Sequence, residues 1–296
     1  MSIPIGSKKL DLPANTYYDA GLSKSCQTHP TNCLPPGLTR TIVKGLLLVV
    51  ERISLVQAGR VFSGKWALRG IDATLEAGKI YALLGANGAG KSTLLQLLAG
   101  WLPLSEGRIL LDESPMRPTA VHLRRKVMLL EESTGRPRGV QYTPTRVLCQ
   151  AIQDYDVQRS GIEDEIADWY DRLDVTSVYD KEARSMSKGQ AYKISMIGLF
   201  LIAPNVWLLD EPFSAGLDAN GLKILETQLR THAERGGIVL FTSQWPEHAR
   251  RLADGALVLD EGKLVWIAPP RQSPKPEIAV AAQPSLQAVL QGLGPE

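Results

Sequence analysis

The sequence predicts an α/β protein with a mostly parallel core sheet flanked by helices, an antiparallel β edge layer and a helical subdomain. Short, continuously apolar runs recur along the chain and alternate with stretches of helical periodicity, which is typical of parallel sheets covered on both faces. Closely spaced strand-like segments precede the first run, and a segment of helical pattern separates the second run from the third. These three observations define the expected layers.

The composition is that of a folded protein. The 296 residues are 44% hydrophobic and 22% charged, which excludes a wholly disordered chain. The 33 Lys and Arg residues nearly balance the 31 Asp and Glu residues, so no nucleic-acid partner is expected. The longest apolar run, from Met196 to Ala203, is far shorter than the roughly 20 residues of a membrane-spanning helix. No secretory signal is seen, and three cysteines favour a reducing compartment.

The edge layer is expected at the start of the ordered chain. Residues 1–45 contain scattered prolines and predict a poorly ordered tail. Strand-like segments cover residues 46–50, 53–55 and 71–75, with turns expected around Gly59 and at residues 63–65. Because these turns are short, the strands are expected to pair antiparallel.

The core sheet and its helices follow. Apolar runs that predict buried strands cover residues 80–84, 127–130, 206–209, 238–241 and 257–259. Helices are predicted over residues 92–99, where Gly100 supplies a stop, and over 220–235, where Leu222, Leu225 and Leu229 share a face.

A helical subdomain is expected at about residues 133–186. Its clearest pattern is an amphipathic helix formed by Ile162, Ile166, Trp169, Tyr170 and Leu173. Residues 269–296 are rich in proline and predict a flexible C-terminal tail.

The first chemical motif is a glycine-rich loop between a predicted strand and a predicted helix. It reads Gly85-Ala86-Asn87-Gly88-Ala89-Gly90-Lys91-Ser92 and fits the phosphate-binding loop. The glycines let backbone N–H groups close around phosphates, and the helix presents its positive end to them. Lys91 adds a cation, the Ser92 hydroxyl is placed to ligate Mg²⁺, and Thr93 can bind a phosphate. A chance match in a glycine-rich turn is disfavoured by the strand before the loop and the helix after it.

Two carboxylates end the buried strand at residues 206–209. Asp210 is expected at the carboxyl end of the sheet, where it can hold Mg²⁺, and Glu211 can act as general base on the attacking water. Alone, this pair could equally be a solvated loop end. The upstream phosphate-binding loop favours the functional interpretation.

A third segment, Met186-Ser187-Lys188-Gly189-Gln190, completes a set of motifs that resembles the ATP-binding cassette (ABC) family. The family signature reads Leu-Ser-Gly-Gly-Gln, so Lys188 stands in place of its first glycine. The resemblance covers residues 46–268 as a nucleotide-binding domain of the P-loop NTPase class. It implies that Ser187, Gly189 and Gln190 bind the γ-phosphate of ATP held by a second cassette. The local alternative is that Ser187 is an ordinary helix cap.

Two further positions resemble family features. Residues 214–218, Ser-Ala-Gly-Leu-Asp, resemble the D-loop that crosses the interface between two cassettes. Phe62 stands where the family places an aromatic ring against adenine. A core aromatic is the alternative for Phe62, and Trp66 is a weaker candidate for the same role.

The sequence departs from the family pattern at two positions. Glu132 aligns with a glutamine that approaches the metal and the water, and it is counted here as a metal ligand. Gln244 stands where the family has its switch histidine, and a neutral amide carries no transferable proton. His248 is expected on the next helix. The expected ATPase is therefore slow or partner-dependent, with Lys91, Glu211 and Gln244 in the catalytic roles, although Gln244 could simply substitute for the histidine.

The resemblance implies a function for the whole chain. Two cassettes would close head to tail on ATP and Mg²⁺ and drive a separate transmembrane permease, which would hold the subunit at the inner face of the membrane. Residues 132–147 are the expected permease contact, with Arg136, Arg138 and Tyr142 as candidates, or else they form a solvated face. The subgroup resembled is the bacterial ABC-2 or haem-exporter type, which favours export. The alternative is a nucleotide-gated regulatory switch. A simple kinase or GTPase is disfavoured by the signature segment.

Overall fold

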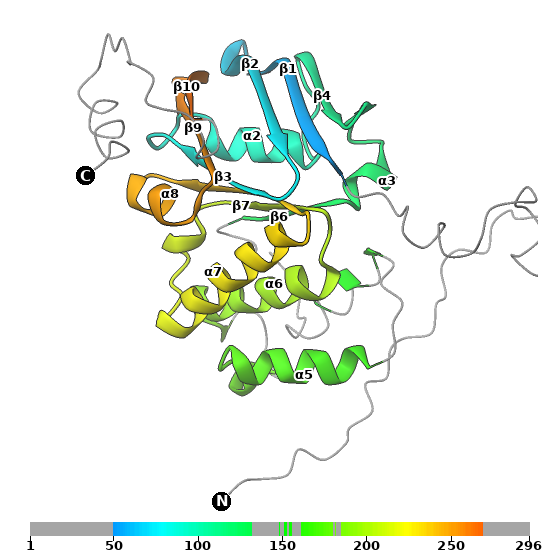
Figure 1. The fold of residues 1–296 in the computed structure, drawn as a ribbon, viewed down its shortest axis with the longest axis vertical. Coiled ribbons are helices and arrows are strands. Elements are labelled where there is room, and N and C mark those ends of the chain that lie inside the picture. Colours follow the sequence, from blue (N-terminus) through cyan, green and yellow to red (C-terminus); the bar gives the residue numbers. More distant parts are fainter. Residues whose placement is uncertain are drawn as a thin grey trace, which may run out of the picture. The chain divides into compact units, whose positions relative to one another are not determined.

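The computed structural model describes residues 50–131, 148, 151–152, 154–155, 161–179, 181 and 185–268. The predicted tails lie outside these residues. About half of the predicted helical subdomain also lies outside them, as does the strand expected at 46–50, apart from Val50. Within the described part, two sheets and the helices around them form the α/β architecture that the sequence predicts (Figure 1).

The larger sheet has six strands in the order β10-β9-β3-β8-β7-β6. Five strands are parallel to their neighbours, and the edge strand β10 pairs antiparallel with β9. Each of the five predicted apolar runs lies in one of the parallel strands. The bounds are β3 Lys79–Leu84, β6 Val127–Leu130, β7 Val206–Leu209, β8 Ile238–Ser243, β9 Gly255–Asp260 and β10 Lys263–Ala268.

The smaller sheet is antiparallel, in the order β2-β1-β4-β5. Its strands are β1 Arg52–Phe62, β2 Lys65–Glu76, β4 Glu106–Leu111 and β5 Ser114–Pro115. The expected turn around Gly59 is wrong, because β1 runs through this residue. The pairing of β1 with β4 shifts register between Val56 and Gly59, so a bulge takes up the irregular backbone and the ladder resumes beyond it. The turn at residues 63–65 is confirmed between β1 and β2.

The helices cover both faces of the larger sheet. Helix α2 (Lys91–Leu98) lies between the two sheets, and its leucines share a core with both of them (Figure 1). On the opposite face α6 (Lys188–Ile202) and α7 (Ala219–Glu234) pack in a second core with α5 (Ile162–Arg172), which lies outside α6. The short helices α3 (Val121–Arg124) and α8 (Pro246–Leu252) follow β5 and β8.

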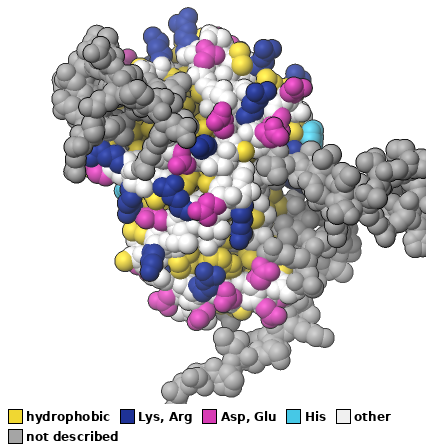
Figure 2. Space-filling view, viewed as in Figure 1, with side chains coloured by type: hydrophobic (Ala, Val, Ile, Leu, Met, Phe, Trp, Pro, Cys, Tyr) yellow, Lys and Arg dark blue, Asp and Glu magenta, His cyan; other side chains and the backbone are white. Residues whose placement is uncertain are grey.

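The surface of the described part carries both signs of charge. Basic and acidic side chains are interspersed over the face shown in Figure 2. Among the described residues no helix is long and apolar enough to cross a bilayer. The larger sheet brings the ends of β3, β7 and β8 together, and the candidate site lies there.

Candidate nucleotide-binding site

The glycine-rich loop connects β3 to α2 as the sequence predicts. Gly90 is the N-cap of α2 and has φ of 104°, in the left-handed region. A Cβ atom there would stand 2.7 Å from the backbone oxygen of Ala67, so the loop packs against β2 with no room for a side chain. The loop therefore leaves its backbone and the first turn of α2 facing one pocket.

Lys91 is the most buried charged side chain at this pocket, with 6% of its surface exposed. Its ammonium donates hydrogen bonds to the backbone oxygens of Gly85 and Ala86, at 2.8 and 3.1 Å. The same Nζ lies 3.4 Å from Oε1 of Glu211. The positive charge thus stands between the loop and the carboxylates that follow β7.

The two carboxylates are positioned by a threonine of the neighbouring strand. The fully buried Thr242 hydroxyl donates to Oδ1 of Asp210 at 2.7 Å and accepts a hydrogen bond from the Glu211 N–H at 2.8 Å. Glu211 has φ of 46°, which turns the chain sharply after the strand. Thr242 was not predicted as a site residue from the sequence. It could have been found because it lies two residues before Gln244, at the end of a predicted parallel strand.

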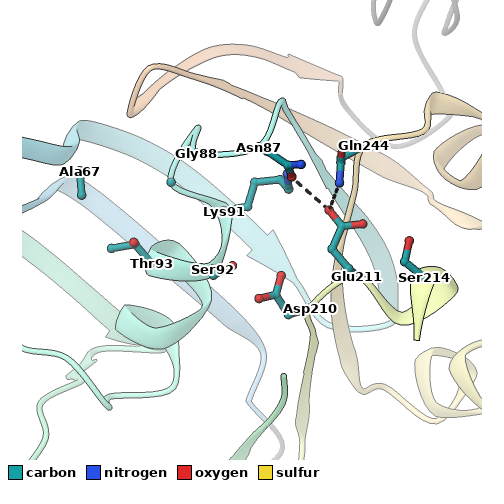
Figure 3. A pocket seen from close by; sticks show the side chains of 11 residues that line it. Ala67, Asn87, Gly88, Lys91, Ser92, Thr93, Asp210, Glu211, Ser214 and Gln244 are labelled. Atoms are coloured by element: carbon teal, nitrogen blue, oxygen red, sulfur yellow. Dashed lines mark hydrogen bonds and ion pairs between the residues drawn. The ribbon is translucent and has the colours of Figure 1, made fainter. Parts of the chain in front are cut away.

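The pocket has a volume of about 510 Å³. Figure 3 shows that Asp210, Glu211 and Gln244 converge on it from β7 and β8, opposite the loop residues. The amide Nε2 of Gln244 lies 3.5 Å from Oε1 of Glu211, a long hydrogen bond at the exposed rim. The predicted site residues that line the pocket are Asn87, Gly88, Gly90, Lys91, Ser92, Thr93, Asp210, Glu211 and Gln244. Ala67 and Ser214 also line it and were not predicted as site residues.

Gly85 and Ala89 belong to the loop but do not line the pocket. The backbone oxygen of Gly85 accepts from Lys91, and Ala89 is buried in the core between the sheets. These two residues therefore support the loop on the side away from the pocket.

The signature residues stand apart from this pocket. Ser187 is the N-cap of α6, and its hydroxyl accepts from the Gln190 N–H at 3.1 Å. The Gln190 side-chain oxygen accepts a hydrogen bond from the Ser187 N–H at 3.0 Å, which completes a capping box. Ser187 therefore caps α6, as its local alternative predicts, and none of Ser187, Gly189 and Gln190 lines the pocket.

The D-loop segment, residues 214–218, connects the pocket with the start of α6, since Ser214 lines the pocket and Gly216 lies next to Gly189. A Cβ atom on Gly189 would stand 2.1 Å from the backbone oxygen of Gly216, so the start of α6 lies directly against this loop. Asp218 caps α7 through the Gly221 N–H and forms an ion pair with the buried Lys193 at 2.7 Å. The hydrogen bond from Lys193 lowers the pKa of Asp218, and the bond from Gly221 adds to this effect.

The remaining predicted positions do not join the pocket. Phe62 is 42% exposed at the end of β1, with the Arg60 guanidinium 4.7 Å from its ring centre. Trp66 is equally exposed on β2 and has Arg69 at 5.3 Å. The core-aromatic alternative for Phe62 is wrong, since the ring is solvent-accessible. Glu132 and the candidate permease contacts Arg136, Arg138 and Tyr142 lie outside the described residues.

Comparison with known proteins decides the family. The family described as ABC transporter matches residues 68–214, from β2 through the carboxylates. The ABC transporter ATP-binding protein YhaQ of Bacillus subtilis is 31% identical over 70% of this chain and 67% of its own length. The chain belongs to the ABC transporter ATP-binding family. As a member of that family, it is an ATP-binding subunit of an ABC transporter and an ATPase.

Other members have more specific names. The energy-coupling factor transporter ATP-binding protein EcfA3 of Clostridium perfringens is 32% identical over 71% of this chain and 74% of its own. The cytochrome c biogenesis ATP-binding export protein CcmA of Idiomarina loihiensis is 28% identical over 67% and 85%. Among solved structures, cbiO1 of Clostridium perfringens, part of the complex cbiONQ, has 25% identity and a TM-score of 0.59 over 74% of this chain and 88% of its own. The cassette fold is therefore shared with subunits of several transporter complexes.

Proposed function

We propose that the pocket binds ATP with Mg²⁺ and hydrolyses it to drive a separate membrane permease. The observation that carries this proposal is the convergence of the loop cation, two carboxylates and a neutral amide on one pocket. Lys91 and the loop N–H groups hold the β- and γ-phosphates. Glu211 accepts a proton from the attacking water, and Gln244 orients that water or the γ-phosphate by donating a hydrogen bond.

The donors available for Mg²⁺ fit its chemistry. The Ser92 hydroxyl and the Asp210 carboxylate line the same pocket, and both are hard oxygen ligands. No cluster of three or more His, Cys, Asp or Glu that could hold a metal occurs among the residues described. Two protein oxygens suit Mg²⁺, which keeps several waters and binds phosphate oxygens of its substrate. When bound, the ion neutralises charge that develops on the phosphates.

Hydrolysis is expected to be slow in the isolated chain. Glu211 is present and held near Lys91, so the general base is available. Gln244 can donate a hydrogen bond but cannot carry the positive charge that a histidine would place beside the γ-phosphate. Glu132, proposed as a further metal or water ligand, would add a negative charge there.

A second cassette completes the site in this proposal. Ser187 and Gln190 of the signature segment are hydrogen-bonded to each other, and both lie outside the pocket of their own chain. The N-terminus of α6, with 15 residues, offers N–H groups to an anion held by another protomer. The exposed ring of Phe62 is available to stack on adenine.

The proposed partner is a transmembrane permease, with the cassette docked at the inner face of the membrane. Export is the proposed direction, because the name of one relative contains "export" and that of a 28% identical relative from Streptomyces peucetius is daunorubicin/doxorubicin resistance ATP-binding protein DrrA. A regulatory switch is a second candidate, favoured by the neutral Gln244 at a position that limits turnover.

Light scattering of the purified chain tests the head-to-tail arrangement. The Glu211→Gln chain should dimerise on Mg-ATP, and Ser187→Asp in the same background should not. Asp is as good an N-cap as Ser, so the helix is retained while a negative charge faces the phosphates. Ser187→Asn is the matched neutral control and should still dimerise. Equal dimerisation of all three chains would contradict binding through the signature segment.

Co-expression with any membrane protein that a neighbouring gene encodes separates transport from a regulatory switch. Capture of that protein by the tagged chain, together with ATP turnover that rises in the complex, supports transport. A chain that turns over ATP and dimerises but captures no membrane protein supports the switch.

A further inference from the structure

His248 lies between the two chain segments that carry Glu211 and Gln244. Its ring packs against Phe213 in a tilted arrangement, with centroids 4.3 Å apart and an interplanar angle of 37°. Phe213 belongs to the 3-10 helix η3 (Pro212–Ser214), directly after Glu211, and it also meets Phe241 edge-on at 5.4 Å. The imidazole thus rests on the segment that carries the general base.

The other side of the same imidazole meets the segment that carries the amide. Its Nδ1 atom lies 2.9 Å from the hydroxyl of Ser243, which is 1% exposed. The Ser243 oxygen also accepts a hydrogen bond from the Trp245 N–H at 3.0 Å, which closes a tight turn around Gln244. Gln244 and Trp245 are exposed, so this buried hydroxyl anchors an otherwise solvated dipeptide.

We propose that His248 is a positioning residue that holds Gln244 against Glu211 through the hydroxyl of Ser243. The inference rests on the proposed function, since it concerns the group that meets the γ-phosphate or the water. The imidazole touches neither Glu211 nor Gln244 and acts through two intermediates, the Phe213 ring on one side and the Ser243 hydroxyl on the other. One side chain therefore fixes the spacing between the base and the amide, whose Nε2 and Oε1 are 3.5 Å apart.

The positioning form is the neutral imidazole. Burial lowers the pKa of His248, the positive charge of Arg251 lowers it further, and Glu247 acts in the opposite direction. These two charged groups lie on α8 itself. The neighbouring elements present the uncharged Phe213 and Ser243. Acid is expected to place a charge in this partly buried site beside Arg251 and to stop Nδ1 from accepting a hydrogen bond from Ser243, and so to loosen the contact.

Substitution at His248 separates its hydrogen bond from its titration. The side-chain amide of Asn places a polar atom two bonds from Cβ, as the imidazole of His places Nδ1. His248→Asn should therefore keep the hydrogen bond to Ser243, and its side chain does not titrate. His248→Leu keeps the bulk and loses the bond. His248→Leu should lower kcat for ATP by about tenfold with KM within twofold, whereas His248→Asn should keep at least about half of kcat. The acid-side fall of kcat, expected below the ordinary histidine pKa of 6.5, should be weaker in His248→Asn than in wild type.

His122→Asn is the matched control, because His122 is exposed on α3, away from the pocket-lining residues. It should change neither kcat nor its pH profile. A double-mutant cycle with Ser243→Ala tests the route: His248→Leu and Ser243→Ala should be strongly non-additive in kcat. A kcat for His248→Leu within twofold of wild type, or additive effects in the cycle, would overturn the proposal.

The NMR signal of Gln244 tests the positioning contact without any measurement of ATP turnover. The side-chain amide resonance of Gln244, assigned with Gln244→Asn, should shift in His248→Leu and stay in place in His248→Asn. Absence of ATP turnover in every chain would count against the proposed catalysis, while this shift would still support the positioning contact. A Gln244 resonance unchanged in His248→Leu would overturn the contact even where turnover is present.

Discussion

Lys91 and Glu211 face each other across the pocket, with 3.4 Å between Nζ and Oε1 and with 6% and 13% of their side chains exposed. The same ammonium also donates to two backbone oxygens of the loop. Its donors are therefore engaged, and the phosphates of ATP must compete with Glu211 for this cation. The contact links nucleotide binding to the position of the proposed general base.

The pair predicts how the Glu211→Gln chain binds nucleotide. In wild type, ATP must break the ion pair between Lys91 and Glu211, at a cost of about 1.4 kcal/mol. Glu211→Gln removes this cost, so ATP should bind roughly tenfold more tightly. Equilibrium binding of a fluorescent ATP analogue measures the change. Glu234→Gln, at the exposed end of α7, is the control and should bind as wild type does. Weaker binding by Glu211→Gln would refute the competition.

Thr242→Val should impair both stability and catalysis. The buried hydroxyl bonds Asp210 and the Glu211 N–H, and valine leaves both partners unsatisfied. Loss of about 1–3 kcal/mol in the free energy of unfolding is expected, with a lower kcat and a higher Mg²⁺ requirement. Urea unfolding and Mg²⁺ titration of turnover provide the measurements. Thr227→Val, where the exposed hydroxyl donates to the Lys223 backbone oxygen, should stay within about 0.5 kcal/mol.

Two glycines of α6 should respond differently to alanine. In Gly189→Ala the new Cβ would meet the Gly216 oxygen at 2.1 Å, so helix or D-loop must move, and the chain should lose about 1–3 kcal/mol. In Gly198→Ala the nearest atoms are the ends of Leu148 and Met128 at 3.3 and 3.8 Å, which can yield. Alanine also favours a helix interior, so Gly198→Ala should stay within about 1 kcal/mol of wild type. Equal destabilisation by thermal unfolding would argue against the close contact with Gly216.

His232 should make the fold sensitive to mild acid. Burial is the main cause that lowers its pKa from 6.5 to about 4, and the ring stacks on Trp207 with centroids 4.0 Å apart. Between pH 6.5 and 4, His232 is protonated in the unfolded chain but neutral in the folded chain. The free energy of unfolding therefore falls as pH drops through this range, by up to about 3 kcal/mol. In His232→Phe the slope of unfolding free energy against pH should flatten over this window. His122→Phe, at an exposed position, should keep the wild-type slope.

The core of the fold could be predicted because each buried parallel strand is a continuous apolar run. The run of β3 and the stop at Gly100 placed two elements within a residue or two. The bulge at Gly59 could not be foreseen, because glycine and polar neighbours predict a turn equally well. Strand β4, with three exposed residues of six, lacked the apolar pattern that marks a core strand.

The phosphate side of the site could be predicted from local motifs, because loop, cation and carboxylates each occupy a few consecutive residues. Contacts between distant segments could not. The hydroxyl of Thr242 reaches Asp210 only because β7 and β8 are parallel neighbours in register. The exposure of Phe62 likewise depends on where the hairpin of β1 and β2 ends.

The most direct test of the account is Mg-ATP turnover by wild type, Glu211→Gln, Gln244→His and the control Glu234→Gln. Wild type and the control should turn over ATP slowly, Glu211→Gln should not turn it over, and Gln244→His should be faster, because a histidine supplies a charge and a transferable proton. Turnover that survives Glu211→Gln, or no turnover in any of the four chains, would contradict it.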